Sequence, residues 1–281
     1  MTRQSQFIGI GDLTKIGVII LVENAVTRYE EENAINLGRC PFKTREAPCG
    51  GAGSWEKSML HISPEWKEAY PGSLFGLLAM SRVSNPASHA GLAKVKEELQ
   101  ADLKALFKNR SDLRALEPIK AYQAYYKKFG NTYHVLQQLE SVLFKGKSIA
   151  SVSALVECMF IEELRNMLLT AGHDLAAIEM PLTLDIAKEG DRYTRINGKD
   201  QEAKPGDMIL RDAAGIISTV IYGPDSRTRI TSSTRTVLFT VYGAPGVGKQ
   251  NVRQHLEGIA TNVKIVAPEA AIDSLEVYSA T

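Results

Sequence analysis

The sequence predicts an α/β protein of the α+β type, in which a helical segment precedes a region of antiparallel strands. Two patterns predict this class. Between residues 118 and 172, apolar side chains recur at spacings of three and four, which is the period of amphipathic helices. After Gly172 the period changes to two and turn residues separate short segments, which is typical of antiparallel strands.

Three consecutive helices are expected in residues 118–172. The first starts at Pro118, a residue that suits the first turn of a helix, and the second ends before Gly146. The third carries the strongest apolar stripe in the chain and is expected to stop at residues 170–172.

Further elements are expected on both sides of this segment. The apolar run at residues 74–83 predicts a buried strand, and the apolar spacing in residues 92–106 predicts an amphipathic helix. After Gly172, strands are expected at residues 182–187, 191–196, 207–211, 215–222, 227–236 and 236–242. A helix at about 247–259 and a strand at 262–267 are expected to follow.

Residues 1–58 differ in pattern from the rest of the chain. They contain one short apolar run, little periodicity and a Gly-rich end, whereas a regular pattern starts at Met59. We therefore expect residues 1–58 to be a weakly ordered N-terminal extension and residues 59–281 to form the folded domain.

The charge of the chain is small overall but uneven along the sequence. The formal net charge is +1, yet residues 104–148 hold nine Lys or Arg against three acidic residues, with tyrosines between them. Such a mixture fits a nucleic-acid surface and equally fits the solvent-exposed side of amphipathic helices. The candidate RNA-binding residues are Lys120, Lys127, Lys128 and Tyr126.

Several classes of protein are not expected. The three cysteines form no pair with metal-ligand spacing and no disulfide framework, so a reducing cytoplasm is the expected location. The apolar run at residues 16–22 is too short to span a membrane. No zinc-site, HExxH or serine-hydrolase spacing is present, so we expect neither a metal nor a cofactor. Membranes and DNA are not expected as partners.

Glu163 interrupts the apolar stripe of the third helix. It lies four residues after Met159 and four before Met167, which places its carboxylate on the apolar face. A buried carboxylate needs a partner or a pocket, because burial of an isolated charge is costly. Glu163 is therefore either half of a structural ion pair or helix-to-strand clamp, or a catalytic carboxylate with a raised pKa.

Two further candidates lie in the second half of the chain. His173, followed by Asp174, is expected at a helix-to-strand junction, either as a general base or as the cap of the preceding helix. If residues 227–236 are extended, their arginines share one face and form either an anion-binding strip or a solvated strand face. The candidate substrate-binding residues are Asp174, Arg227, Thr228, Arg229 and Thr231.

The segment GAPGVGKQ at residues 243–250 has the spacing of a phosphate-binding loop. Gly243, Gly248 and Lys249 fit the pattern GxxxxGK, but Gln250 stands where a Ser or Thr hydroxyl would bind magnesium. We interpret residues 243–248 as a Gly/Pro turn and expect no nucleotide at Lys249.

The run YKKFGNTYHVLQQLESVLFKGKSIASVSALVE at residues 126–157, followed by TAGHDL, a GDMI strand and RTRIT, resembles one family. It is similar to the tRNA-binding and editing module (B3/B4) of the bacterial phenylalanyl-tRNA synthetase β subunit, in a free-standing form. The resemblance implies a sheet sandwich with flanking helices. In the synthetase, this module hydrolyses tyrosine wrongly attached to phenylalanine-specific tRNA. The synthetase's catalytic core and ATP site have no counterpart here, so a complete ligase is not expected.

Two functions follow from this resemblance, both with tRNA or aminoacyl-tRNA as the partner. The first is hydrolysis of mischarged aminoacyl-tRNA in trans, with Glu163 and His173 as the catalytic residues. The second is a non-catalytic module that binds RNA or an amino-acid-like ligand. A pocket with convergent polar groups would favour the first function, and an interior filled with side chains would favour the second.

Overall fold

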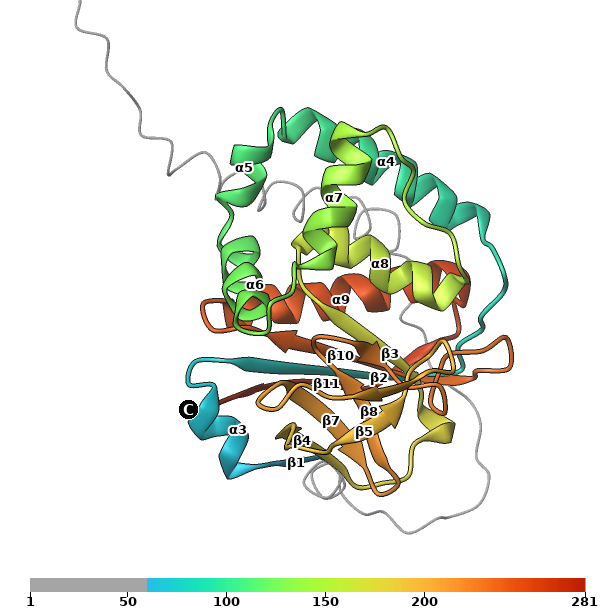
Figure 1. The fold of residues 1–281 in the computed structure, drawn as a ribbon. Coiled ribbons are helices and arrows are strands. Elements are labelled where there is room, and N and C mark those ends of the chain that lie inside the picture. Colours follow the sequence, from blue (N-terminus) through green and yellow to red (C-terminus); the bar gives the residue numbers. More distant parts are fainter. Residues whose placement is uncertain (1–59, 281) are drawn as a thin grey trace, which may run out of the picture. The chain divides into compact units, whose positions relative to one another are not determined.

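A four-stranded sheet lies at the centre of residues 60–280, the part of the chain that the structure, a computed structural model, describes (Figure 1). Helices cover one face of this sheet, and a second sheet packs against the other face (Figure 1). The α+β class and the antiparallel-rich sheet sandwich with flanking helices are therefore confirmed. The expected boundary between residues 58 and 59 lies outside the described residues, and the extension remains a prediction.

The central sheet has the strand order β11-β2-β10-β3, and its strand pairs are antiparallel. Its strands are β2 (Leu74–Ser81), β3 (Thr170–Asp174), β10 (Thr236–Gly243) and β11 (Ala271–Ser279). Strand β2 is buried along almost its whole length, because it lies between β11 and β10 with packed layers on both faces. The strands predicted at residues 74–83 and 236–242 are confirmed.

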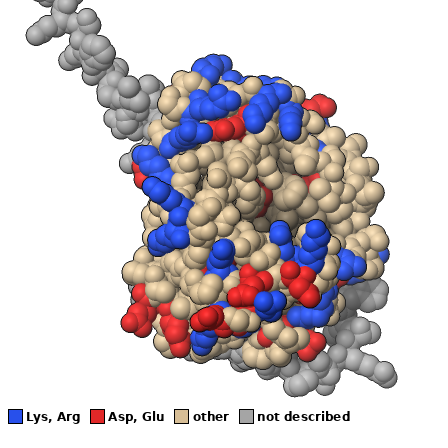
Figure 2. All heavy atoms as spheres, viewed as in Figure 1, with Lys and Arg blue, Asp and Glu red and all other residues tan. Residues whose placement is uncertain are grey.

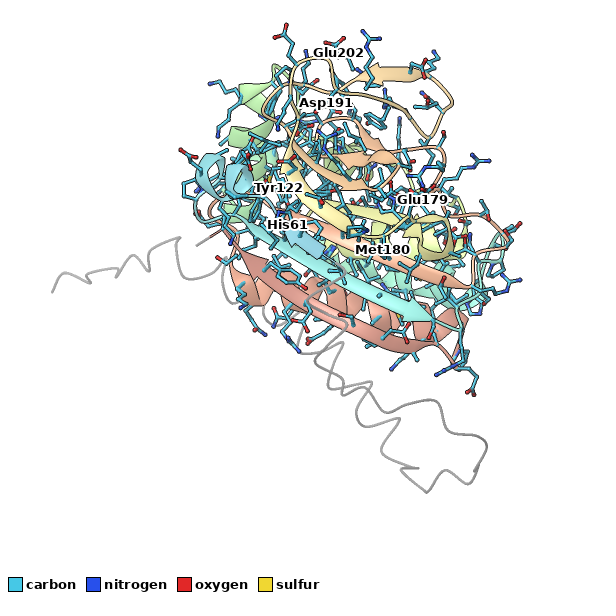
Figure 3. The ribbon with its side chains drawn as sticks, turned by 90° about the horizontal axis from the view of Figure 1, so that it is seen from below. His61, Tyr122, Glu179, Met180, Asp191 and Glu202 are labelled. Atoms are coloured by element: carbon cyan, nitrogen blue, oxygen red, sulfur yellow. The ribbon has the colours of Figure 1, made fainter. Side chains whose placement is uncertain are left out.

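The second sheet has the strand order β1-β4-β7-β8-β9. Its strands are β1 (Leu60–Ile62), β4 (Leu182–Ile186), β7 (Met208–Asp212), β8 (Gly215–Thr219) and β9 (Gly223–Pro224). The β1–β4 pair is parallel and the other pairs of this sheet are antiparallel. Strands β5 (Arg192–Thr194) and β6 (Asp200–Glu202) form a hairpin, and Figure 3 shows Glu202 at the outer edge of the molecule.

The helices lie mainly on one side of the central sheet (Figure 1). They are α3 (Pro64–Ala69), α4 (Ala90–Leu106), α5 (Arg110–Arg114), α6 (Glu117–Lys128), α7 (His134–Phe144), α8 (Ala154–Asn166) and α9 (Lys249–Val266), with the short 3-10 helix η1 (Leu175–Ala177). The helix predicted at residues 92–106 and the three predicted in residues 118–172 correspond to α4, α6, α7 and α8.

Two glycines allow helices to approach the central sheet closely. A Cβ atom on Gly76 in β2 would lie 2.6 Å from Val252 in α9. A Cβ atom on Gly172 in β3 would lie 3.1 Å from Met159 in α8. Side chains alternate across a strand, so residues next to these glycines point to the second sheet. Tyr242 of β10, the cross-strand partner of Phe75, points there too, since its hydroxyl hydrogen-bonds Ser218 of β8.

Buried tyrosines of α6 join the helical layer to both sheets. The Tyr122 hydroxyl donates to a main-chain carbonyl in β10 at 2.7 Å, and the Tyr125 hydroxyl donates to Asp207, just before β7, at 2.6 Å. The Tyr126 hydroxyl donates to a main-chain carbonyl just after β8 at 2.8 Å. Tyr133 stacks on Tyr122 with ring centroids 4.6 Å apart. Tyr122, Tyr125 and Tyr126 therefore form the interior face of α6.

The predicted end of the third helix is wrong. Helix α8 ends at Asn166, and Met167 closes it with a left-handed φ of 59°. Residues 170–174 form β3, which pairs with β10. The apolar stripe continues past the helix end because the first residues beyond it are also buried, so periodicity alone does not locate the boundary.

Two strand predictions are also wrong. Residues 226–235 form a loop, because their polar side chains bond the nearby main chain: Asp225 accepts from the Thr228 amide, and Thr234 accepts from the Thr231 amide. Residues 262–266 belong to α9, where Ile259 and Val263 continue the buried face. The strand that follows α9 is β11.

Gly258 of α9 lies against Glu162 of α8, so the substitution Gly258→Ala is expected to destabilise the protein. A Cβ atom there would lie 2.3 Å from Glu162 Oε2, and Glu162 is held by Asn166 and Asn262. Displacing Glu162 breaks these bonds, so we expect the free energy of unfolding to fall by about 1–3 kcal/mol in chemical denaturation, despite the higher helix propensity of alanine.

The control for this prediction is the Glu162→Ala background. There the obstruction is gone, so Gly258→Ala should be neutral or stabilising. An equal loss of stability in both backgrounds would contradict the proposed contact.

Candidate functional site

Glu163 lies inside the protein and joins α8 to β3. Its side chain is 2 % exposed, and its Oε1 atom accepts a hydrogen bond of 2.8 Å from the main-chain amide of Thr170. No ion pair of Glu163 with an arginine or lysine occurs within residues 60–280. Of the alternatives that the sequence left open, the geometry matches the helix-to-strand clamp.

Burial controls the charge of Glu163. Loss of solvation raises the pKa of its carboxyl from 4.5 to about 8, although the bond from the Thr170 amide acts in the opposite direction. The carboxyl is therefore largely protonated at neutral pH. The hydroxyls of Tyr122, Tyr126 and Tyr133 lie close enough for an ionised Glu163 to raise their pKa values further.

His173 lies on the other face of the central sheet. Gly172 faces α8, so its neighbour His173 points towards the second sheet, as side chains alternate along a strand. Its Nδ1 atom lies 2.7 Å from the hydroxyl of Thr228 in the loop after β9. Glu163 and His173, predicted to act together, are thus not brought together in one site.

The His173 ring is part of a short polar chain between the sheets. Thr228 donates its hydroxyl proton to Asp225, so the Nδ1–H group of His173 is the donor to Thr228. Burial lowers the pKa of His173 to about 3, which keeps the ring neutral. The ring is fully buried, and its Nε2 atom has no hydrogen-bond partner among the described residues.

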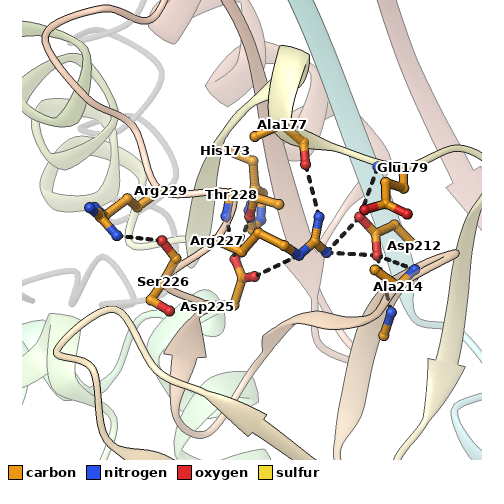
Figure 4. Close-up of polar contacts among 11 residues, drawn as sticks. His173, Ala177, Glu179, Asp212, Ala214, Asp225, Ser226, Arg227, Thr228 and Arg229 are labelled. Carbon is orange, nitrogen blue, oxygen red and sulfur yellow. Dashed lines mark hydrogen bonds and ion pairs between the residues drawn. The ribbon is translucent and has the colours of Figure 1, made fainter.

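Arg227 forms an ion pair beside this chain (Figure 4). Its Nη2 atom donates to both carboxylate oxygens of Asp212, at 2.8 and 2.7 Å, and its Nη1 atom donates to a carbonyl of η1. The Asp212 side chain is fully buried and also accepts from the main-chain amide of Glu179. The arginine therefore compensates a buried carboxylate and ties the end of β3 to the β7–β8 turn.

The other predicted substrate-binding residues have local structural contacts. Asp174 accepts hydrogen bonds from the Ala176 amide and the Thr234 hydroxyl, so it caps η1 and holds the loop. The Thr231 hydroxyl lies 2.8 Å from that of Ser233. Arg229 is exposed and donates to a main-chain carbonyl (Figure 4), so of these residues its guanidinium is the most accessible to an anion.

The basic side chains predicted to bind RNA lie on the surface, whereas the tyrosine does not. Lys120, Lys127 and Lys128 are exposed on α6. Lys120 pairs with Glu117 of its own helix at 3.2 Å. Tyr126 is 2 % exposed, because its ring is part of the interior face of α6. It cannot stack on an RNA base in this structure, and that part of the prediction is corrected.

Figure 2 shows where the positive charge gathers on one face of the molecule. Blue side chains stand around a hollow whose walls are mostly uncharged. The nine Lys or Arg residues of segment 104–148 are exposed; they are Lys104, Lys108, Arg110, Arg114, Lys120, Lys127, Lys128, Lys145 and Lys147. Glu140 pairs with Arg110 and Arg114, which leaves most of the other side chains for solvent or a polyanion.

A cleft of about 370 Å³ opens between α7, residues 147–150 and α8. The sequence did not indicate this cleft, because its lining residues come from three separate segments and form no recognisable motif. Phe160 and Leu164 of α8 form part of its wall, and Gln137 and Gln138 of α7 face them. Glu163, the residue that the sequence pattern indicated on α8, is not part of the lining of this cleft.

Residues 243–250 form the turn between β10 and α9. The strand β10 is antiparallel to both of its neighbours, whereas a phosphate-binding loop follows a strand of a parallel sheet. Within residues 60–280, no three His, Cys, Asp or Glu side chains gather as a metal site requires. None of the helices in these residues has the length and apolar character needed to cross a membrane.

A comparison with protein-family models identifies the fold. Residues 120–264, which extend from α6 into α9, match the model of the B3/4 domain. The chain belongs to the B3/4 domain family. This confirms the resemblance drawn from the sequence. Strands β2 and β11 lie outside the match but complete the central sheet of the B3/4 domain protein.

Solved structures are also similar to this chain, whereas no curated protein matches it. One of these structures is an N-terminal fragment of the phenylalanyl-tRNA synthetase β-subunit from Pyrococcus horikoshii, with a TM-score of 0.40 and 11 % identity. The similarity covers 78 % of this chain and 50 % of the fragment, so the chain spans half the length of that structure.

The raised pKa of Glu163 predicts a pH dependence of stability. The folded state holds the proton more tightly than the unfolded state, so the free energy of unfolding should fall as pH rises from 4.5 towards 8 and level off above it. The steepest loss from this group is on the order of 1.4 kcal/mol per pH unit. Glu163→Gln, which keeps an acceptor for Thr170, should remove this part of the slope in denaturation measured from pH 5 to 9.

Glu97→Gln is the control for this measurement, because Glu97 is exposed on α4 and its change should leave the slope as it is. A Glu163→Gln variant with the wild-type pH slope would show that the Glu163 carboxyl is already ionised in the folded protein.

Proposed function

We propose that this B3/4 domain protein binds tRNA through the exposed basic residues of segment 104–148. The observation that carries the proposal is the charge of this surface: nine Lys or Arg stand against three acidic residues, on a chain whose net charge is +1. Their charges attract phosphates, and the attraction does not depend on base sequence. Lys127, Lys145 and Lys147 form no ion pair within residues 60–280, so each can bind a phosphate without giving up an internal partner.

Hydrolysis by Glu163 and His173 is not part of this proposal. The two side chains are buried on opposite faces of the central sheet, and the tyrosines Tyr122, Tyr126 and Tyr133 fill the interior beside Glu163. A general base needs to come within hydrogen-bond reach of its substrate. Of the two functions expected from the sequence, the geometry therefore supports the module that binds without catalysis.

Charge reversal tests the proposal. The double variant Lys127→Glu, Lys145→Glu should weaken binding of fluorescently labelled tRNA at least about tenfold at low salt, measured by anisotropy. The dependence of log Kd on log salt should become less steep by about one for each phosphate that the variant no longer binds. Hydrolysis of a panel of aminoacyl-tRNAs, measured alongside, should not exceed the rate without protein.

The matched control is Lys199→Glu, an exposed lysine in the β5–β6 hairpin. Binding that falls equally in this control would refute a role for segment 104–148. Rapid deacylation of one aminoacyl-tRNA that survives in Glu163→Gln would place catalysis elsewhere, and deacylation lost only in that variant would restore Glu163 as a catalytic residue.

A further inference from the structure

We propose that the cleft between α7 and α8 binds a nucleobase together with its 5′-phosphate. Where that nucleotide belongs to an RNA strand, the inference rests on the proposed RNA binding. The cleft has a volume of about 370 Å³, which falls within the range of small-ligand sites. It opens to solvent between α7 and the segment that joins α7 to α8.

One wall of the cleft is apolar and offers a surface for a flat ring. Val142, Ile149 and Leu164 are buried there, whereas Phe160 is half-buried and keeps part of its ring accessible. Phe160 forms no ring contact with another aromatic residue among the described residues. An aromatic side chain in this position stacks on a base, and every base has a face for such a contact.

Two glutamines of α7 also line the cleft and carry paired donors and acceptors. The side-chain amides of Gln137 and Gln138 have no hydrogen-bond partner within residues 60–280, and each offers an acceptor beside two donors. A glutamine amide matches the edge of adenine, where a ring nitrogen accepts and the amino group donates. The hydroxyl of Ser148 adds a further polar group at the rim.

The charge of the cleft selects an anion. Lys147 is the one Lys, Arg, Asp or Glu among the described lining residues, and it is exposed without an ion pair. Burial lowers the pKa of His134, another lining residue, and its Nδ1 atom lies 3.2 Å from the Tyr126 hydroxyl. A single lysine beside neutral groups suits a phosphate.

The same lining fits a free α-amino acid less well. A carboxylate is the strongest partner for its ammonium group, and the described lining contains no Asp or Glu. The chemistry therefore favours a nucleotide over the amino-acid-like ligand that the sequence left open.

The test is calorimetric titration of the full chain with adenosine 5′-monophosphate, adenosine and ribose 5-phosphate. The monophosphate should bind saturably. Lys147→Ala should weaken it about tenfold and leave adenosine unchanged, whereas Gln138→Leu should weaken both. Thermal unfolding of each variant checks that it is folded.

The control variant is Lys249→Ala, in a second hollow of about 350 Å³ beside α9 and β11. It should leave all three affinities unchanged. The proposal is overturned if the monophosphate shows no saturable binding at millimolar concentration, or if Lys249→Ala weakens it while Lys147→Ala does not.

Competition distinguishes a free nucleotide from the end of an RNA. A hairpin with a single-stranded 3′ overhang that displaces the monophosphate, where a blunt hairpin does not, identifies an RNA end as the source. Displacement by neither hairpin identifies a free nucleotide. If tRNA binds but the monophosphate does not, the cleft proposal is wrong and the proposed function stands. If the monophosphate binds but tRNA does not, the proposed function is wrong and the cleft proposal stands for a free nucleotide.

Discussion

Three tyrosine hydroxyls of α6 fix the position of the helical layer relative to both sheets. Tyr122 bonds the central sheet, whereas Tyr125 and Tyr126 bond the second sheet at the start of β7 and the end of β8. Each hydroxyl is buried, so a shift of α6 would leave polar groups without partners at a cost of about 1–3 kcal/mol each. The three bonds reach two different sheets, so α6 cannot move relative to either sheet without breaking a hydrogen bond.

This packing also decides what Glu163 does. The tyrosine rings occupy the space next to its carboxyl, and its hydrogen bond goes to the first residue of β3. A protonated carboxyl in such surroundings acts as a neutral group that holds a helix to a strand. On the exposed side of α6, Lys127 forms no ion pair within residues 60–280, whereas Lys120 pairs with Glu117. In the proposed function, the buried side of α6 contributes stability and its exposed side contributes binding.

The spacing of apolar residues predicted the helices that bury one face. It was less informative where side chains hydrogen-bond the nearby main chain. Helices α4, α6 and α7 followed from apolar spacing, and the burial of Glu163 followed from its place on the α8 stripe. The loop at residues 226–235 could not be predicted in this way, because Asp225 and Thr234 bond the main chain and compete with strand pairing. His173 was placed at a helix end because the spacing does not change where α8 gives way to β3. The α7–α8 cleft combines residues from three segments, and its polar groups have no motif.

The order of strands in the central sheet has a consequence for how the chain folds. Strand β2, at residues 74–81, pairs with residues 236–243 on one edge and with residues 271–279 on the other. Both pairings therefore require the last part of the described chain. The antiparallel strands of the second sheet lie within residues 182–224 and pair over short distances. Because loop closure over long separations slows folding, the second sheet has the shorter entropic path to its native pairing. During synthesis, the apolar strand β2 therefore remains without its sheet partners until more than 150 further residues have been added. Exposed apolar strands of this kind promote aggregation of a nascent chain.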